Sequence, residues 1–306
     1  MNAAYVATVQ LLLDIAPAVF QSTLFAMKGG TALNLFIQDL PRLSVDIDVV
    51  FLPRDLDREG ALKAITDELM AAKGRIEAMG FAAEVRQNKS GEEAKMFITS
   101  SGFDVKVEVN FIFRGSVLAP VRRSLSPAAQ SLFAANAEVL MLDVPELYGS
   151  KLVAAMDRQH PRDLFDVQWM FDSFGLPPEF VDCFVVYLAG HNRPVHEVLF
   201  PAAHPMAEIF ASEFSGMTVR PASLEKLEAT RVRLFDMLPK ALTAAHHAFL
   251  LSLVRGEPDW GLMRFPHLQE LPAIRWKLVN LAKLKKGNPA RFALQHEELA
   301  ARLITP

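Results

Sequence analysis

The chain has 306 residues, of which 51% are hydrophobic and 22% charged, and this predicts a folded protein of two domains or of one domain with a large extension. Its net charge of −3 excludes a general electrostatic attraction to nucleic acid, so such binding would need a local basic patch. The single cysteine, Cys183, excludes an intramolecular disulfide and a cysteine-based zinc cluster. Because the N-terminus lacks a basic signal-peptide region and its apolar run is too short to span a bilayer, we expect a cytoplasmic protein with no membrane partner.

The first 143 residues alternate between helical and strand-like patterns. The periodicity predicts helices over 5–20, 31–38 and 58–79, and strands over 25–28, 44–51, 81–87, 95–100 and 104–113. Turn residues lie at 88–91 and 101–102. Strands and helices mixed in this way predict an α+β (or α/β) sheet domain over 1–143.

The character of the chain changes at Asp143-Val144-Pro145-Glu146, which has the composition of a helix start. Only helical patterns follow, over 145–158, 162–174, 178–190, 222–236, 239–255, 271–284 and 289–303. The sequence therefore predicts a helical domain over 144–306.

A glycine turn and a pair of aspartates carry the strongest chemical signal in the sheet domain. Gly29-Gly30 follows a short apolar strand, and glycine backbone can be approached by phosphate oxygens without meeting a Cβ atom. Asp46 and Asp48 lie one residue apart in an apolar strand, so both carboxylates point to the same face. Two anions this close need a cation between them, and Mg²⁺ takes oxygen ligands while keeping sites for phosphates. The pattern predicts a nucleoside triphosphate and metal site.

Glu108 is the candidate for a third carboxylate. In the strand over 104–113, Asp104, Lys106, Glu108 and Asn110 share one face. If this strand lies beside the Asp46–Asp48 strand, Glu108 completes a three-carboxylate metal site. The alternative is a polar stripe that faces solvent.

A second group of charged residues opens the helical domain. Lys151 lies on a helix whose neighbouring positions are apolar or small, so its stem can pack inward and its ammonium group can meet a triphosphate. Asp163 and Asp166 share a face of the next helix. Asp163 also suits the first turn of a helix, and we expect it to pair with Arg158 or Arg162. Asp166 lies between Phe165 and Val167, and a carboxylate in such surroundings needs a partner.

These motifs together resemble the AbiEii-type nucleotidyltransferase toxins, a branch of the DNA polymerase β-like superfamily that occurs in bacterial toxin–antitoxin and phage-defence systems. The resemblance rests on Lys28-Gly29-Gly30-Thr31-x-Leu33 with Ser44-x-Asp46-Ile47-Asp48, on Glu146-Leu147 with Lys151, and on Arg162-Asp163 with Asp166. The segment from Ile274 to Leu284, followed by Asn288-Pro289, is similar to the long members of the group. The resemblance implies a polymerase β-like mixed sheet with flanking helices, followed by a helical C-terminal domain.

The resemblance also implies roles for individual residues. Asp46 and Asp48, with Glu108 as a third ligand, would hold Mg²⁺, with Mn²⁺ as an alternative. The triphosphate of an NTP substrate would contact Lys28, Gly29, Gly30, Ser44 and Lys151. Asp46, Asp48, Lys151 and Asp166 would be the catalytic residues, with Asp166 either acting at the attacking hydroxyl or orienting a catalytic group.

The acceptor implied by the resemblance is the 3′ end of tRNA, and the implied protein partner is a cognate antitoxin. The sequence adds a basic and aromatic stretch near its C-terminus: Arg275, Trp276, Lys277, Lys283, Lys285, Lys286, Arg291 and Phe292. Such a stretch can follow a phosphate backbone, or it can be an ordinary solvated helix face. Two other functions stay open: modification of a protein or small molecule by nucleotidyl transfer, and a catalytically silent relative that only binds nucleotide or a partner.

Overall fold

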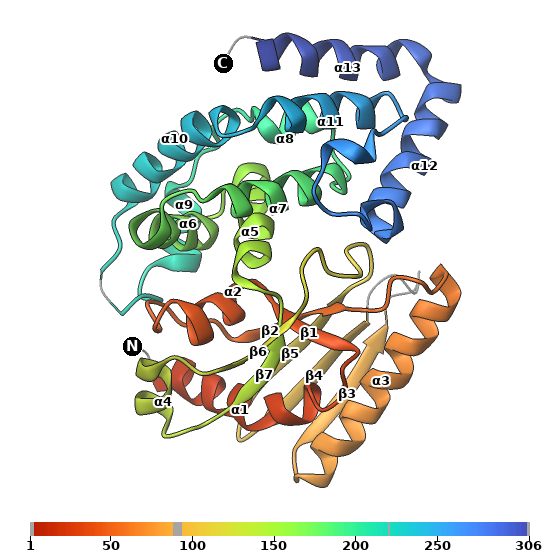
Figure 1. Cartoon of the computed structure of the whole chain (residues 1–306). Helices are drawn as coiled ribbons and strands as arrows, with labels where there is room; N and C mark the ends of the chain where they lie inside the picture. Colours follow the sequence, from red (N-terminus) through yellow and green to blue (C-terminus); the bar gives the residue numbers. More distant parts are fainter. Residues whose placement is uncertain (1–2, 88–93, 220, 305–306) are drawn as a thin grey trace. The chain divides into compact units, whose positions relative to one another are not determined.

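The computed structural model describes residues 3–87, 94–219 and 221–304 (Figure 1). These residues form two compact units: Met1–Leu147 together with Ser215–Pro221, and Tyr148–Phe214 together with Ala222–Pro306. We call them the sheet unit and the helical unit. The domain boundary expected at residues 143 and 144 stays a prediction, and the turn expected at 88–91 lies outside the described residues.

A seven-stranded mixed sheet forms the centre of the sheet unit, in the order β3-β4-β5-β2-β1-β7-β6. Its strands are β1 (Phe25–Lys28), β2 (Asp46–Phe51), β3 (Ala82–Gln87), β4 (Ala94–Ser100), β5 (Phe103–Asn110), β6 (Val121–Ser124) and β7 (Glu138–Met141). β2 runs parallel to β5 and β1 runs parallel to β7, whereas the other neighbours are antiparallel. The predicted class, a mixed sheet with flanking helices followed by a helical part, is confirmed.

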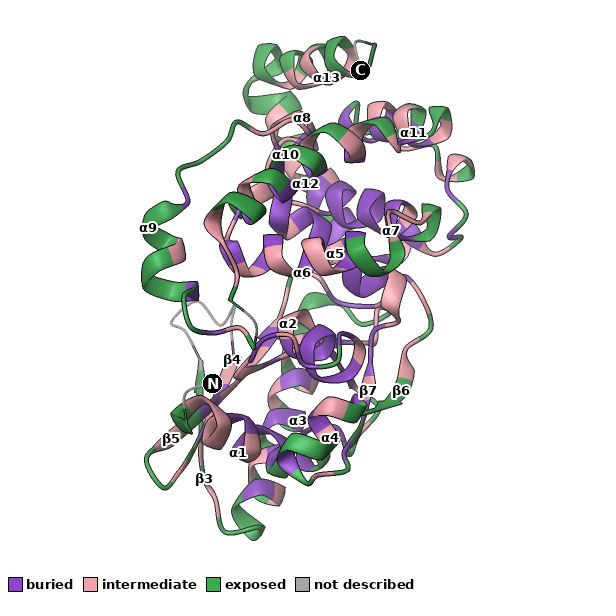
Figure 2. Cartoon of the chain, turned by 90° about the vertical axis from the view of Figure 1, so that its left-hand side faces the viewer, coloured by how far each residue is buried: buried purple, intermediate pink, exposed green. Residues whose placement is uncertain are grey.

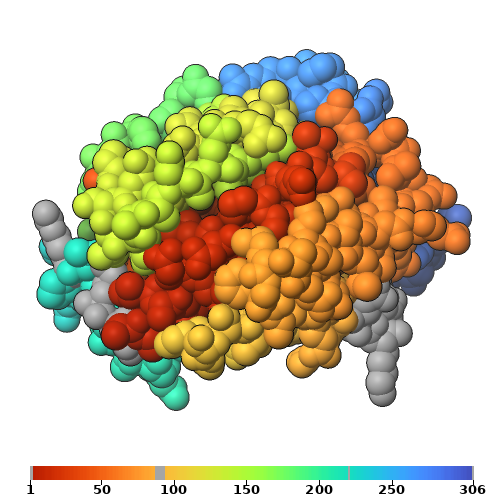
Figure 3. All heavy atoms as spheres, turned by 90° about the horizontal axis from the view of Figure 1, so that it is seen from below, coloured from red at the N-terminus to blue at the C-terminus, as the bar shows by residue number. Residues whose placement is uncertain are grey.

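The two faces of the sheet differ because side chains alternate along each strand. On β5, Val105, Val107 and Val109 are buried, while Lys106 and Glu108 point to the opposite face and are half-buried. Helices α1 (Ala3–Val19) and α3 (Arg58–Ala78) pack against each other and against β3, β4, β5 and β7. Figure 3 shows red N-terminal residues lying beside the orange residues of α3 on this side of the sheet unit. We call the opposite side, which carries Lys106 and Glu108, the polar face.

Two parts of the sheet unit differ from the prediction. The helix expected over 31–38 is a single turn, α2 (Gly29–Thr31), that continues as a π-helix over Ala32–Ile37. The sequence also gave no signal for β6, α4 (Pro127–Phe133) or β7. β6 and β7 have only four residues each, and β6 is an exposed edge strand, so neither shows the apolar alternation on which strand prediction depends.

In the described part of the helical unit, every element is helical. It contains the end of α5 (Val144–Arg158), then α6 (Pro161–Phe174), α7 (Pro178–Ala189), α8 (Val195–Leu199), α9 (Ala207–Ile209) with a π-helix over Phe210–Phe214, α10 (Leu224–Lys240), α11 (Ala244–Val254), two 3₁₀ turns over Trp260–Leu262 and Leu268–Glu270, α12 (Pro272–Gly287) and α13 (Pro289–Ile304). Figure 2 shows that α7 is buried over most of its length, and its buried side chains form a large part of the core of this unit.

Among the described residues, one bent pair of helices has the length and apolarity of a membrane span. None of the helices in the described ranges has, on its own, the length and apolarity to cross a bilayer, and α10 with α11 meets that test only as a pair bent by 88°.

Candidate functional site

The turn after β1 brings three side chains close to its two glycines. Gly29 has a φ of +77°, and a Cβ atom on it would lie 2.3 Å from Oδ2 of Asp48. A Cβ atom on Gly30 would lie 2.8 Å from Nη2 of Arg42 and 3.0 Å from Oγ of Ser44. The glycines are therefore required by the approach of Asp48, Arg42 and Ser44 as well as by the backbone conformation.

A hydrogen bond ties this turn to β2. The hydroxyl group of Thr31, in the first helical turn, donates to the backbone carbonyl of Asp46. Because β1 also pairs with β2 and places Lys28 opposite Asp48, the turn and the two aspartates are held in one register. The structure thus brings together the nucleotide-binding residues that were predicted in this unit.

Arg42 was not among the predicted site residues, yet it is 2% exposed and lies beside Gly30. It lies outside any periodic segment, on a stretch that pairs with residues distant in the chain. Arg42 forms a β-bridge with Thr218, and the backbone N–H of Leu43 donates to the carbonyl of Met217 at 3.2 Å. Only the fold shows that this arginine lies at the glycine turn.

The strand register places the three predicted carboxylates next to one another on the polar face. Asp48 lies opposite Glu108 on the parallel strand β5, and Asp46 lies opposite Lys106. Paired residues on neighbouring strands point to the same side of a sheet. We call Asp46, Asp48 and Glu108 the carboxylate row.

Two lysines neutralise Glu108. Its Oε1 lies 2.9 Å from Nζ of Lys95 and 3.1 Å from Nζ of Lys106, and the Lys106 ammonium group is also 3.8 Å from Oδ1 of Asp46. Partial burial raises the pKa of Glu108, but the two ammonium groups outweigh this, so the pKa lies below its ordinary value. Glu108 is therefore ionised near neutral pH and engaged by lysines.

The carboxylate row fits a divalent metal ion in part. Asp46 and Asp48 offer hard oxygen ligands on one face, and Oδ2 of Asp48 lies where a side chain on Gly29 would be, at the turn expected to receive phosphates. No group of three or more His, Cys, Asp or Glu side chains with metal-binding geometry occurs among the described residues. The donor set of this arrangement is the aspartate pair, with Glu108 turned to its lysines.

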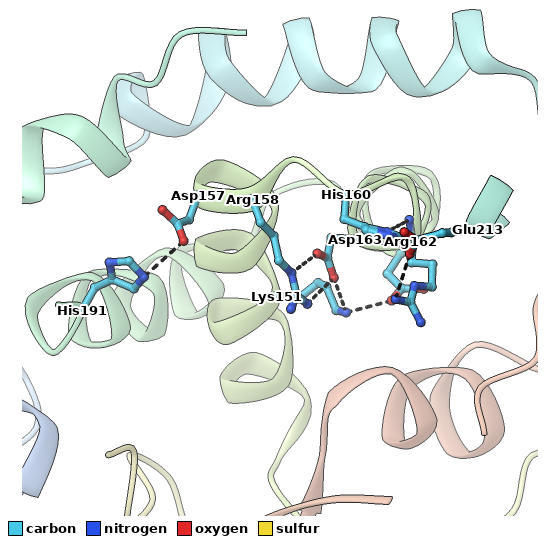
Figure 4. A network of polar contacts seen from close by, with 9 residues as sticks. Lys151, Asp157, Arg158, His160, Arg162, Asp163, His191 and Glu213 are labelled. Atoms are coloured by element: carbon cyan, nitrogen blue, oxygen red, sulfur yellow. Dashed lines mark hydrogen bonds and ion pairs between the residues drawn. The ribbon is translucent and has the colours of Figure 1, made fainter. Parts of the chain in front are cut away.

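A buried ion-pair cluster occupies the start of the helical unit. Nζ of Lys151 on α5 lies 2.9 Å from Oδ1 of Asp163 on α6 (Figure 4). The same Nζ lies 3.0 Å from Oδ2 of Asp166, also on α6. The three side chains are 7%, 2% and 0% exposed. We call them the buried triad. Its lysine stem packs inward and Asp166 has a charged partner, as the sequence indicated.

Asp163 has a second cation. Arg158, at the end of α5, donates to both of its carboxylate oxygens, and it is one of the two arginines expected to do so. Burial raises the pKa of Asp163, but the attraction of Lys151 and Arg158 is stronger, and the pKa lies well below its ordinary range. Asp163 is therefore permanently ionised at neutral pH.

Close helix packing holds the triad in place. A Cβ atom on Gly149 would lie 2.5 Å from the Cβ atom of Cys183, so this glycine lets α5 approach α7 closely. His160 caps α6 by accepting from the N–H of Arg162, and its Nε2 lies 3.2 Å from Glu213 (Figure 4). These contacts fix where α6 starts and therefore where Asp163 and Asp166 lie.

One member of the predicted basic stretch differs from the expectation. Lys277 is only 5% exposed, and its ammonium group donates to the backbone carbonyl of Arg193 at 2.6 Å. It is thus part of the core of the helical unit and is not a surface cation. Trp276 is 47% exposed, and Lys283 lies over its ring at 5.5 Å from the centroid.

Two comparisons relate the chain to known proteins. A model of the AbiEii family, described as a nucleotidyl transferase toxin of a type IV toxin–antitoxin system, matches residues 10–280. Among solved structures, the chain is similar to MenT4, a nucleotidyltransferase toxin from Mycobacterium tuberculosis H37Rv, with a TM-score of 0.61, 17% identity, and coverage of 91% of this chain and 94% of that one. A CdnC–HORMA complex from E. coli MS115-1 aligns over 88% of both chains at 13% identity, but its TM-score of 0.23 is too low to indicate a shared fold. No curated protein sequence matches the chain.

Proposed function

The chain belongs to the AbiEii family of nucleotidyltransferase toxins, as its motifs indicated, and from this premise we propose that it is a Mg²⁺-dependent enzyme that transfers NMP from an NTP to the 3′ end of tRNA. The observation that carries the proposal is the strand register that sets Asp48 between the glycine turn and Glu108. In this arrangement phosphates and an aspartate pair meet at one point of the polar face.

The proposed reaction is an in-line displacement. The acceptor hydroxyl attacks the α-phosphorus, a new O–P bond forms, the bond to the β-phosphate oxygen breaks, pyrophosphate leaves, and the hydroxyl proton passes to solvent. Mg²⁺ held by Asp46 and Asp48 would neutralise charge on the transferring phosphate and the leaving group. The backbone of Gly29 and Gly30, with Lys28 and Ser44, binds and orients the triphosphate.

The buried triad supplies the remaining groups in this proposal. Lys151 contributes positive charge toward the triphosphate, and Asp166 orients the attacking hydroxyl. Arg158 also binds Asp163, so this carboxylate has two cations and the position of Lys151 is fixed by its ion pairs with Asp163 and Asp166.

RNA as the acceptor has support from the surface of the helical unit. Arg275, Lys283, Lys285 and Lys286 are exposed on α12. Lys283 lies over the exposed ring of Trp276, and Lys285 lies over the ring of Phe292. Cations next to an aromatic ring suit a phosphate backbone and its bases. We further propose that a cognate antitoxin restrains the enzyme, since the family model describes a type IV toxin–antitoxin system.

The decisive experiment measures where a nucleotide is transferred. Purified protein is incubated with each α-labelled NTP, Mg²⁺ or Mn²⁺, and total RNA, and the products are separated into RNA, protein and small molecules. We expect label on tRNA, its loss with a chelator, and its loss in Asp48→Ala. Asp67→Ala is the matched control, because Asp67 is an exposed aspartate on α3 that pairs with Lys63.

The other outcomes separate the alternatives. Label on protein or on a small molecule would refute the tRNA acceptor and keep the nucleotidyl transfer. A complete absence of label from wild type under all of these conditions would favour a catalytically silent relative.

A further inference from the structure

The polar face continues beyond the carboxylate row into an open hollow. The hollow has a volume of about 450 Å³, and its lining includes Glu84, Arg86, Phe97, Thr99 and Asp104. The strands that line the hollow all belong to the sheet unit. The register of β4 and β5 relates the hollow to the carboxylate row, because Phe97 lies opposite Lys106 and Thr99 lies opposite Asp104. A volume in this range suits a ligand of nucleoside size.

The lining favours a flat, uncharged ligand with hydrogen-bond donors. The guanidinium group of Arg86 lies 4.7 Å from the centroid of the half-buried Phe97 ring, and Glu84 accepts from Arg86 at 2.7 Å. The guanidinium group lies over the ring, and a planar cation supported in this way by an aromatic ring forms a platform on which a nucleobase can stack. Glu84 and Asp104 repel phosphate, but their oxygens can accept from the amino groups of a base.

The position of the hollow relative to the glycine turn indicates which base it would take. The turn that receives the triphosphate follows β1, on one side of the carboxylate row, whereas the hollow lies over β5, β4 and β3 on the other side. In an in-line displacement the attacking hydroxyl arrives opposite the leaving pyrophosphate. The acceptor therefore approaches from the side of β5.

We propose that this hollow binds the terminal nucleobase of a nucleic-acid acceptor, stacked on the Arg86 guanidinium group that the Phe97 ring supports, so that the sugar hydroxyl of the acceptor reaches the carboxylate row. Lys106, which lies 3.1 Å from Glu108 and opposite Phe97, connects the base site to the reacting groups. The inference rests on the proposed function for the reaction, but the base site itself can be tested by binding.

The test combines a variant of the protein with a variant of the ligand. A fluorescent RNA oligomer is prepared with its 3′-terminal base and with an abasic 3′ nucleoside, and its affinity is measured without NTP for wild type, Phe97→Ala and Phe97→Tyr. Stacking losses of this kind correspond to about tenfold in affinity. We expect Phe97→Ala to lower the affinity for the normal oligomer about tenfold and Phe97→Tyr to have the affinity of wild type. Removing the terminal base should lower the affinity of wild type for the oligomer but should not change the affinity of Phe97→Ala.

Arg86→Ala is compared with a matched arginine on the opposite edge of the sheet. Arg122 on β6 is also exposed and forms an ion pair with a glutamate, but it lies far from the hollow in strand order. Arg86→Ala should lower the affinity for the oligomer several-fold more than Arg122→Ala does, while the two variants should have the same thermal midpoint of unfolding.

Steady-state kinetics separate this inference from the proposed function. In Phe97→Ala we expect the KM for RNA to rise about tenfold while the KM for NTP stays unchanged. Equal RNA affinity and KM in wild type and Phe97→Ala, with transfer intact, would overturn the base site and leave the proposed function standing. A rise in the KM for NTP alone would also overturn it. RNA binding that depends on Phe97 without any transfer would support the site and refute the proposed reaction.

Discussion

Replacing Lys151 by methionine tests whether the buried triad is an ion-pair core. Methionine keeps most of the volume of the lysine stem but removes the ammonium group that lies 2.9 Å from Asp163 and 3.0 Å from Asp166. Removing one member of a buried ion pair costs about 3–5 kcal/mol, because the charge left behind stays desolvated. Since Asp163 keeps its contact with Arg158, we expect the lower end, a loss of about 3 kcal/mol in the free energy of unfolding at pH 7.

The assay is urea unfolding followed by circular dichroism at two pH values. Lys240→Met is the control, because Lys240 forms an exposed helical pair with Asp236, and its loss should cost less than about 1 kcal/mol. The deficit of Lys151→Met should shrink toward pH 5. Without the ammonium group the pKa of a buried carboxyl rises, so the folded variant takes up a proton and gains stability relative to wild type as the pH falls. Equal losses in the two variants, or a deficit independent of pH, would refute the reasoning.

Three further changes test single features of the two units. Gly29→Ala should cost about 1–2 kcal/mol in left-handed backbone strain and displace Asp48, so both the thermal midpoint and nucleotidyl transfer should fall. Glu146→Gln should lower the free energy of unfolding by about 1.5–3 kcal/mol in urea titrations, because the buried carboxylate accepts the backbone N–H of Val117 at 2.8 Å and that of Leu118 at 2.9 Å. Burial lowers the pKa of Lys277 from 10.5 to about 8, so the unfolded state binds more protons than the folded state between these pH values. The free energy of unfolding of wild type should therefore rise by about 3 kcal/mol as the pH increases from 8 to 10.5. Lys277→Met should lack this rise when urea midpoints are measured across the same pH range.

Local periodicity was sufficient to predict the elements that carry the candidate site. The alternation around Asp46 and Asp48 predicted that both face one side of a strand, and helical spacing predicted that Lys151 packs inward. The proximity of Glu108 was conditional on two strands being neighbours, and the pairing of β2 with β5 fulfils that condition.

The partners of these residues could not be predicted, because they depend on register and chain crossing. A shift of one residue between β4 and β5 would turn Lys95 away from Glu108, and alternation within one strand does not fix that shift. Arg42 lies in a segment without periodicity and reaches the glycine turn only through the bridge to Thr218. The hollow beside Phe97 likewise arises from three strands together.

The two charged clusters differ in how readily their members can change partners. The side chains of the carboxylate row and its lysines are about a third exposed where they pair, so water offsets much of each ion pair, which is worth about 0–1 kcal/mol. A metal ion or a phosphate can replace such contacts at little cost. The buried triad has no comparable access to water, and its separation costs several kcal/mol. A Lys151 variant can therefore lose activity both because less of it is folded and because a charged group is missing from the reaction. Asp48→Ala, in contrast, loses activity because the chemistry of the polar face is changed.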